Sequence, residues 1–311
     1  MSPKPRGATA AGVRGNGSAA DRVRDRWAQW LLSTRDAGDP EERRRTLEYL
    51  TPVREHVLDN SDLRPGDVLL DVGCGDGLIA FAGLDRVGPG GRVIFADISQ
   101  DLIHHCRALA DELDVLDRCD FVSASADDLP VGNASVDVVT TRSVLIYLDR
   151  TGKERAFREF HRVLRPGGRI SLAEPINSFG YPQPTGWYNG YDLRAIADLV
   201  RKVLEVSSPP EEETLIDFDE RDLLAWAESA GFDPLRLEYE AKVEQGSWMH
   251  GTWEHVLNSS GNPLVPTLGD AIERALTPEE AARFETHLRP LVEANMGRLR
   301  SAFAFLHGVK H

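Results

Sequence analysis

The sequence predicts an α/β protein built on a doubly wound, mostly parallel β-sheet. Short apolar runs alternate with amphipathic stretches along the chain, as expected when buried strands alternate with helices. A glycine-rich turn joins the first of these strands to its helix. With 311 residues, the chain is long enough to bury a full core.

The glycine-rich turn is the stretch around which the rest of the chain is organised. The apolar run from Val68 to Leu70 predicts a buried strand that ends at Asp71. Three glycines follow at alternate positions, and they are Gly73, Gly75 and Gly77. Glycine permits a tight turn here and lets a ligand contact bare backbone N–H groups. Because a helix beginning at Leu78 points its N-terminal amides at the same crevice, we predict a nucleotide-type binding turn.

The spacing of the glycines distinguishes between ligand classes. A dinucleotide turn needs G-x-G-x-x-G, whereas here the third glycine falls one residue early, so we expect no NAD or FAD. No Gly-Lys-Ser/Thr sequence follows to grip phosphate. The form Asp-x-Gly-x-Gly-x-Gly, from Asp71 to Gly77, resembles the first motif of class I S-adenosylmethionine (SAM) dependent methyltransferases. The resemblance implies that the methionine part of SAM lies over this loop.

The next two strands carry the groups expected at the nucleoside. The strand Arg92–Asp97 ends in a carboxylate that can accept hydrogen bonds from both hydroxyls of a ribose. A third strand, 121–124, leads into Ser125–Pro130. In the family that the chain resembles, this stretch usually reads Asp-Ala-x-x-Leu-Pro and holds the adenine. Here Ser125 replaces the aspartate, and Asp127 is the alternative source of a carboxylate.

The fourth and fifth strands complete the resemblance. The apolar run 135–141 predicts a buried parallel strand, and Arg142-Ser143 follows at its C-terminal end, where ligands bind in open α/β sheets. A helix is predicted over 153–164 and a strand over 169–173. The run Phe160–Gly168 resembles the R-V-L-K/R-P-G-G signature of small-molecule class I methyltransferases, similar to the ubiquinone/menaquinone-type and arsenite-type enzymes.

Four motifs in the expected order between residues 65 and 175 carry this resemblance. It implies a Rossmann-like, seven-stranded sheet closed by an antiparallel last strand, with SAM as cofactor and S-adenosylhomocysteine (SAH) as product. The cofactor-binding residues that it implies are Asp71, Gly73, Cys74, Gly75, Asp97, Ile98, Ser125, Ala126, Asp127, Arg142 and Ser143.

The flanking segments set the expected domain organisation. Residues 1–20 are small, polar and basic, which predicts a disordered tail. Two amphipathic helices are predicted within 21–62, the second starting at Asp39-Pro40, and they cover the sheet or form a lid over the substrate. The methyltransferase domain is expected over 63–311. It carries insertions at about 176–212 and at about 246–299, the second of them helical and placed before the last strand.

The C-terminal third of the chain should complete the sheet. A helix is predicted over 218–231, followed by an alternating strand over 233–245. The last strand is predicted at 302–310. Between these strands, helices are expected near 267–276 and over 278–295, the latter preceded by a Thr-Pro-x-Glu capping sequence.

Composition narrows the compartment and the partners. The net charge of −14 and the pI near 5.1 argue against nucleic acid or an anionic membrane as a partner. The cysteines, at positions 74, 106 and 119, are too few and scattered for a disulfide framework or a structural metal site. No apolar stretch approaches the roughly 18 residues of a membrane span, and no signal peptide is recognisable. We expect a cytoplasmic protein without a metal, and a homodimer is compatible with the sequence.

The resemblance implies methyl transfer from SAM to an O, N or C nucleophile of a small organic molecule, such as a secondary metabolite. Arsenite is disfavoured, because the segments expected to form the substrate pocket hold no cysteine. A peptide or protein methyltransferase and a non-catalytic SAM-binding scaffold stay open as alternatives.

Candidate residues for catalysis and substrate binding come from segments expected to meet at one edge of the sheet. The catalytic candidates are Glu174, His250 and Tyr147. The substrate-binding candidates are mostly aromatic, which fits the apolar lining of ligand pockets. They are Trp27, Trp30, Asn177, Tyr181, Trp187, Tyr188, Tyr191 and Trp248.

Overall fold

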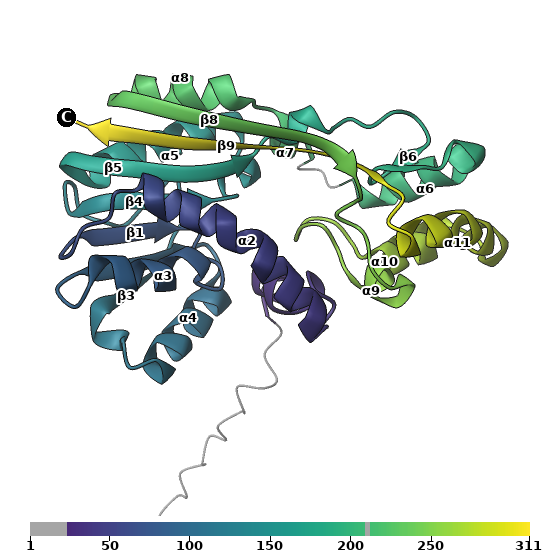
Figure 1. The fold of residues 1–311 in the computed structure, drawn as a ribbon, viewed down its shortest axis with the longest axis horizontal. Coiled ribbons are helices and arrows are strands. Elements are labelled where there is room, and N and C mark those ends of the chain that lie inside the picture. Colours follow the sequence, from purple (N-terminus) through teal and green to yellow (C-terminus); the bar gives the residue numbers. More distant parts are fainter. Residues whose placement is uncertain (1–23, 209–211) are drawn as a thin grey trace, which may run out of the picture.

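The structure is a computed structural model that describes residues 24–208 and 212–311 (Figure 1). Its centre is a seven-stranded sheet with the order β3-β2-β1-β4-β5-β9-β8. Strands β1 to β5 pair in parallel, and β9 runs antiparallel to both of its neighbours. This confirms the predicted doubly wound, mostly parallel sheet closed by an antiparallel strand. The tail predicted at 1–20 lies outside the described residues.

The strands lie close to their predicted positions. They are β1 (Val68–Val72), β2 (Arg92–Asp97), β3 (Cys119–Ser123), β4 (Val136–Arg142), β5 (Leu164–Pro175), β8 (Phe232–Gln245) and β9 (Arg298–Lys310). Two limits differ clearly from the predictions, since β9 begins at Arg298 rather than Ala302, and β5 begins at Leu164 rather than Arg169. Residues 165–168, predicted as a turn before β5, form an irregularity inside it: Val136 pairs with Leu164, and Val138 pairs with Arg169.

Helices cover both faces of the sheet. One face carries α2 (Pro40–Asn60), α3 (Leu78–Val87) and α4 (Gln100–Glu112), and the other carries α5 (Arg150–Val163) and α8 (Glu220–Ala230). The first face is closed by residues such as Leu84 and Phe95, and the second by residues such as Phe157 and Trp226, all of them buried. This burial holds the carboxyl ends of β1 to β5 at one rigid edge.

The two last strands extend past the rest of the sheet. The pairing of β5 with β9 ends at Pro175 and Phe303, whereas β8 and β9 continue together to Gln245 and Arg298. Because β9 is antiparallel to both neighbours, β8 runs in the same direction as β5. The insertion after β8 therefore leaves from the carboxyl edge of the sheet, where the glycine turn also lies.

The two predicted insertions pack against each other and form one helical lobe, which the sequence did not predict (Figure 1). The first contributes β6 (Trp187–Tyr188), β7 (Tyr191–Asp192) and α6 (Ala197–Ser207), and is followed by α7 (Glu212–Ile216). The second contributes α9 (Trp253–Asn258), α10 (Leu268–Ala275) and α11 (Pro278–Glu293). Thr277 and Glu280 make the predicted reciprocal capping box at the start of α11.

The N-terminal segment begins with a short α1 (Arg26–Gln29), capped by Asp25, which continues into the π-helical turn η2 (Trp30–Thr34). Ala37 and Gly38 then both adopt positive φ, +47° and +72°, and separate this segment from α2. Asp39 caps α2, and Pro40 occupies its first turn, as predicted. The chain therefore reverses at two consecutive left-handed residues between η2 and α2.

The helical lobe should depend on Phe284 for its stability. This side chain of α11 is fully buried and lies edge-on to Tyr188, with the ring centroids 6.1 Å apart. We expect Phe284→Ala to lower the free energy of unfolding by about 3–5 kcal/mol, because it leaves a cavity between the two insertions. Thermal and denaturant unfolding measure the change. Leu113→Ala, at a site 54% exposed, is the matched control, and an equal loss in both variants would contradict the packing described here.

Candidate functional site

The glycine turn is shaped by close contacts. Gly73 has a φ of +66°, and a Cβ at this position would lie 2.1 Å from Cγ2 of Val144 in the loop after β4. Gly75 has a φ of +57°, and Gly77, with a φ of +87°, is the residue before α3. Any side chain at Gly73 would therefore push the two loops apart, in addition to straining the backbone.

Asp71 lies beneath the turn and holds it. Its Oδ2 accepts a hydrogen bond from the N–H of Ala80 at 3.1 Å, and its Oδ1 accepts one from the hydroxyl of Thr140 at 2.8 Å. Burial raises the pKa of Asp71 to about 7, although these two bonds act in the opposite direction. Asp71 thus ties β1 to β4 and to the first turn of α3.

Asp97, at the end of β2, faces the same turn. Its Oδ2 accepts from the N–H of Gly75 at 2.9 Å, and its Oδ1 accepts from the N–H of Ser99 at 2.8 Å. Burial raises the pKa of this carboxyl. Each carboxylate oxygen keeps a second lone pair, so a vicinal diol can still donate to it. The next residue, Ile98, is 57% exposed and offers an apolar surface beside the carboxylate.

The stretch expected at the adenine is held by its own side chains. The hydroxyl of Ser125 donates to Oδ1 of Asp127 at 2.5 Å, and Arg155 forms an ion pair with Oδ2 of the same carboxylate. Ala126 is buried between them. The carboxylate that is missing at position 125 is therefore supplied nearby by Asp127, which already has two partners.

Arg142 lies at the carboxyl end of β4, next to the glycine turn. Its guanidinium donates one hydrogen bond, at 3.3 Å, to the hydroxyl of Ser143, a residue whose own φ is +55°. Burial lowers the pKa of Arg142. The guanidinium and the glycine turn line a small cavity of about 30 Å³, which Leu31 of the N-terminal segment also lines. A partly buried guanidinium whose hydrogen-bond partner among the described residues is a neutral hydroxyl is suited to bind an anionic group of a ligand.

Glu174 lies below the loop after β4 and orders it. The carboxylate Oε1 accepts from the N–H groups of Val144 and Leu145, at 2.9 and 3.2 Å. Its Oε2 is buried and has no partner among the described residues. Burial raises the pKa of Glu174 to about 7. By strand alternation Glu174 points to the same face as Leu172, which packs in the core beneath α5, and its carboxylate orders the loop after β4 from below.

Two pairs of aromatic side chains lie near Arg142, and each pair joins different parts of the chain. Tyr147, in η4 (Leu145–Tyr147), lies edge-on to Trp27 of α1, with the ring centroids 4.9 Å apart. Tyr49 of α2 contacts Trp248 in the same way, also at 4.9 Å. Nε1 of Trp30 donates to the carbonyl of Ser260, at 2.9 Å. The N-terminal segment thereby contacts both the loop after β4 and the helical insertion.

Other predicted site residues lie apart from this cluster. Tyr188 and Tyr191 are buried in the core of the helical lobe, where they pack rather than line a substrate wall. The amide of Asn177 donates to the carbonyl of Leu215. Tyr181 is 40% exposed and bonds to Asn189. Trp187, in β6, belongs to the same two-stranded turn as Tyr188.

His250 lies in the segment between β8 and α9, and the hydrogen bonds and ion pairs of the described residues do not link it to Glu174 or Tyr147. No group of three or more potential metal ligands occurs in residues 24–208 and 212–311. Within the same residues, no helix is both long and apolar enough to cross a membrane.

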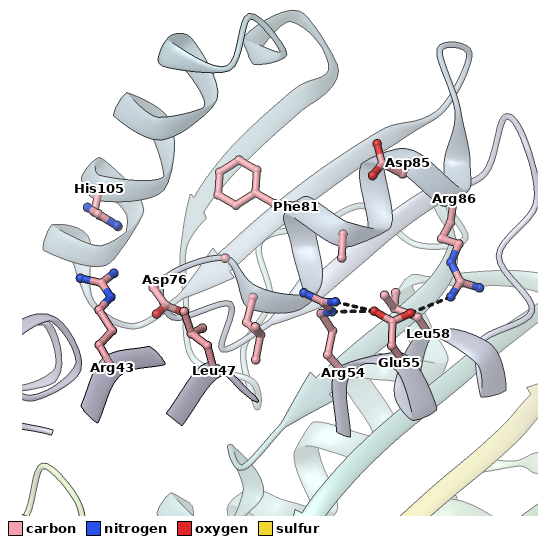
Figure 2. A pocket seen from close by; sticks show the side chains of 13 residues that line it. Arg43, Leu47, Arg54, Glu55, Leu58, Asp76, Phe81, Asp85, Arg86 and His105 are labelled. Carbon is pink, nitrogen blue, oxygen red and sulfur yellow. Dashed lines mark hydrogen bonds and ion pairs between the residues drawn. The ribbon is translucent and has the colours of Figure 1, made fainter. Parts of the chain in front are cut away.

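A second cavity, of about 540 Å³, adjoins the glycine turn from outside (Figure 2). It lies between α2 and α3, and Asp76 and Leu78 line both this cavity and the smaller one. Figure 2 shows Arg54 and Arg86 bonded to Glu55 from either side at one end of it. Acidic and basic groups are balanced around this groove, and none of the predicted substrate-binding residues lines it. The candidate site is therefore the crevice between the glycine turn, Asp97 and Arg142.

The match to a known domain coincides with this crevice. The family model described as a methyltransferase domain matches residues 69–168, from β1 into the irregular part of β5. Residues 69–168 are thus a class I SAM-dependent methyltransferase domain. SAM is the methyl donor of this family, and three features around the glycine turn fit it. They are the carboxylate of Asp97 beside the exposed Ile98, the backbone of the glycine turn, and the partly buried guanidinium of Arg142.

Curated relatives differ in the atom that they methylate. The chain is 38% identical to nocamycin O-methyltransferase of Saccharothrix syringae over 42% of this chain and 45% of the relative. It is 26% identical to the ubiquinone/menaquinone biosynthesis C-methyltransferase UbiE of Hydrogenovibrio crunogenus over 65% of this chain and 79% of the relative. It is 31% identical to arsenite methyltransferase of Halobacterium salinarum over 54% of this chain and 46% of the relative. The chain thus spans less than half of the first and third of these relatives.

Among solved structures, the YcgJ protein of Bacillus subtilis has the same fold. Its TM-score is 0.52 and its identity is 17%, over 84% of this chain and 99% of that protein. At this identity the likeness concerns the fold alone.

Four residues of the site were not predicted from the sequence. Val144 and Thr140 act through contacts with the glycine turn and with Asp71. Leu31 and Asp25 come from the N-terminal segment, which lies far away in the sequence. The position of Asp25 before an apolar stretch is a cap signal, but only the fold brings it to Ser99.

Glu174 should make the stability of this methyltransferase domain depend on pH. In the folded protein its pKa is raised to about 7, above the ordinary value of 4.5 for a glutamate. The stability that it contributes is therefore fully present below pH 4.5 and is lost as the pH rises through about 7. Glu174→Gln keeps an acceptor for Val144 and cannot ionise. We expect the free energy of unfolding of the variant to increase relative to that of the wild type as the pH rises, by up to about 3 kcal/mol.

Urea unfolding of both proteins at about pH 5 and pH 8 measures this difference, with the exposed Glu273→Gln as the control. A difference between Glu174→Gln and wild type that stays constant with pH would contradict the burial described for Glu174.

Proposed function

We propose that this protein transfers the methyl group of SAM to an O, N or C nucleophile of a small organic molecule. The observation that carries the proposal is the hydrogen bond from the N–H of Gly75 to Asp97, because it holds the glycine turn against a carboxylate suited to a ribose. The family membership of residues 69–168 supports the same activity. The whole protein's substrate and activity are part of this proposal.

The cofactor residues proposed here form a continuous path. Asp97 accepts the ribose hydroxyls, Ile98 covers one face of the adenine, and Asp127 lies at its polar edge. The backbone at Gly73 and Gly75 lies under the methionine part. Arg142 is the counterion for the methionine carboxylate, since it lines the cavity at the turn and, among residues 24–208 and 212–311, its guanidinium bonds to a neutral hydroxyl and to no carboxylate.

The bound cofactor supplies a methyl group that is already activated by its sulfonium. The chain therefore has to hold the nucleophile in line with the methyl carbon, and positioning of this kind is worth several kcal/mol. The aromatic pair Trp27 and Tyr147 forms one wall of the proposed substrate site, and Tyr49 with Trp248 forms a second. Such walls exclude water and orient a flat or apolar substrate.

A base is needed only where the nucleophile arrives protonated. Burial raises the pKa of Tyr147, so its hydroxyl stays neutral and serves as a hydrogen-bond donor rather than a base. Glu174 is turned away below the loop. His250 stays a candidate base, carried by the segment after β8 that also presents Trp248 to Tyr49.

Arsenite is disfavoured as a substrate, despite the similarity to an arsenite methyltransferase. Cys74 and Cys106 are buried beneath the glycine turn, and the thiol of Cys106 donates to the carbonyl of Gly75 at 3.3 Å. Cys119 is buried at the start of β3. None of these thiols belongs to the aromatic walls, and a soft metalloid needs thiolate ligands at the site of transfer.

Release of SAH from SAM, measured over a library of phenols, enols, amines and acidic carbon compounds, tests the proposal. Turnover with a small molecule supports it. Turnover with a peptide library alone would favour the peptide or protein alternative, and SAM binding without any turnover would favour a non-catalytic scaffold.

Two substitutions should distinguish binding at the methionine end of the cofactor site from binding at its ribose end. We expect Arg142→Met to weaken SAH binding about ten-fold or more, because it removes the counterion of the carboxylate. It should leave the affinity for 5′-methylthioadenosine unchanged, since that compound has no amino-acid part. Asp97→Asn should weaken both ligands, because both contain the ribose.

Calorimetric titration of the purified chain measures these affinities. The control is Arg201→Met, at an exposed arginine of α6 that forms an ion pair with Glu205. Equal losses of SAH and 5′-methylthioadenosine in Arg142→Met would overturn the assignment of Arg142.

A further inference from the structure

The N-terminal segment 25–36 lies directly over the proposed cofactor crevice and is anchored at both ends of it. At the ribose end, the hydroxyl of Ser99 donates to Oδ2 of Asp25 at 2.7 Å, and the N–H of Asp25 donates to Oδ2 of Asp101 at 2.7 Å. At the other end, Arg35 lies 3.8 Å from the carboxylate of Asp76, in the glycine turn. The segment therefore bridges the crevice from Ser99 to Asp76.

Between these anchors, the side chain of Leu31 fills the space above the turn. Its Cδ2 lies 3.0 Å from the position that a Cβ of Gly75 would take. The cavity that Leu31 and Arg142 line together measures about 30 Å³. That is about the share of liquid volume that one water molecule takes, about 30 Å³, and far less than the amino-acid part of SAM requires.

We propose that segment 25–36 is a lid and that Leu31 is the side chain which the methionine part of SAM must displace. The inference rests on the proposed SAM site. Leu31 and the methionine part compete for the same volume over Gly75, whereas the ribose and adenine positions at Asp97 and Ile98 lie outside that volume. The competition therefore acts on one end of the cofactor only.

A hinge for this movement is present next to the lid. Ala37 and Gly38 both have positive φ, Gly38 is exposed, and a Cβ on Gly38 would meet nothing within 4 Å. A few residues at the end of an element commonly absorb the rotation when a lid opens. Opening by rotation at Ala37 and Gly38 breaks the bonds of Asp25 and Arg35 described above, the bond of Trp30 to Ser260, and the hydrogen bond from the hydroxyl of Thr46 to the buried Asp36, at 2.8 Å.

The populations of the closed and open lid set the apparent affinity. If the closed state excludes the methionine part, the measured dissociation constant equals the intrinsic one divided by the open fraction. A smaller side chain at Leu31 removes apolar contact from the closed state and raises the open fraction. A larger side chain there adds apolar contact and lowers the open fraction.

The test uses SAH, which contains the amino-acid part, and 5′-methylthioadenosine, which lacks it. Both are titrated into the full chain and into its variants by calorimetry. We expect Leu31→Ala to bind SAH about three- to ten-fold more tightly, from the apolar contact that it removes from the closed lid. Leu31→Phe should bind SAH more weakly. The affinity for 5′-methylthioadenosine should stay within about two-fold of the wild type in both variants, since the lid competes only with the methionine part.

Leu204→Ala, at a site 41% exposed on α6 outside the lid, is the matched control and should change neither affinity. The melting temperature of each variant shows whether it is folded. Unchanged or weaker SAH binding by Leu31→Ala, or equal shifts for the two ligands, would overturn the lid proposal. Failure of the wild type to bind either ligand would instead overturn the proposed function.

Discussion

The contact between the glycine turn and the loop after β4 is the constraint on which the rest of the site depends. Gly73 can approach Val144 only because it has no Cβ, and Val144 is held in place by the buried carboxylate of Glu174. The same turn is held from the other side, where Asp97 accepts from the N–H of Gly75. Groups at the ends of β2, β4 and β5 therefore fix the position of the loop after β1. A cofactor site built on such a loop is ordered before any ligand binds, which reduces the entropy lost on binding.

This arrangement concentrates acidic groups in a desolvated place. Burial raises the pKa values of Asp71, Asp97 and Glu174, and each carboxylate accepts hydrogen bonds from backbone N–H groups or, for Asp71, also from the hydroxyl of Thr140. Such donors compensate a buried carboxylate without adding a mobile charge. Arg142 lowers the pKa values of Asp71 and Glu174 through space, but its guanidinium forms no ion pair with either carboxylate among the described residues. The negative groups beside the turn also favour a sulfonium, so the acids and Arg142 suit the two charged ends of one zwitterionic cofactor.

The strands and the glycine turn were predictable because they depend on local patterns: apolar runs of strand length, glycine spacing and an acid after the second strand. The antiparallel closing strand followed from the resemblance to class I methyltransferases. The helical lobe was not, because nothing in the sequence of either insertion indicates that it packs against the other. Tyr188 and Tyr191 show the reason. An aromatic residue in a loop has the same signature whether it lines a pocket or fills a core, and the partner that decides, α11, lies about 90 residues further along the chain. Glu174 shows a second limit, since a carboxylate at a strand end suggests chemistry, whereas strand alternation turns it below the loop.

The lid connects the cofactor crevice to the proposed substrate walls through a single rigid piece of chain. Trp27 and Trp30 are carried by the same short helical segment as Leu31, and they contact Tyr147 and the backbone of Ser260. A displacement of Leu31 large enough to admit an amino-acid group must also move these two indoles, because the residues between them are helical. The wall formed by Trp27 and Tyr147 therefore serves methyl transfer only when the lid settles again over the bound cofactor, with Leu31 outside the volume above Gly75. Substrate positioning in this chain depends on the position of the lid, and the lid depends on what fills the volume above Gly75.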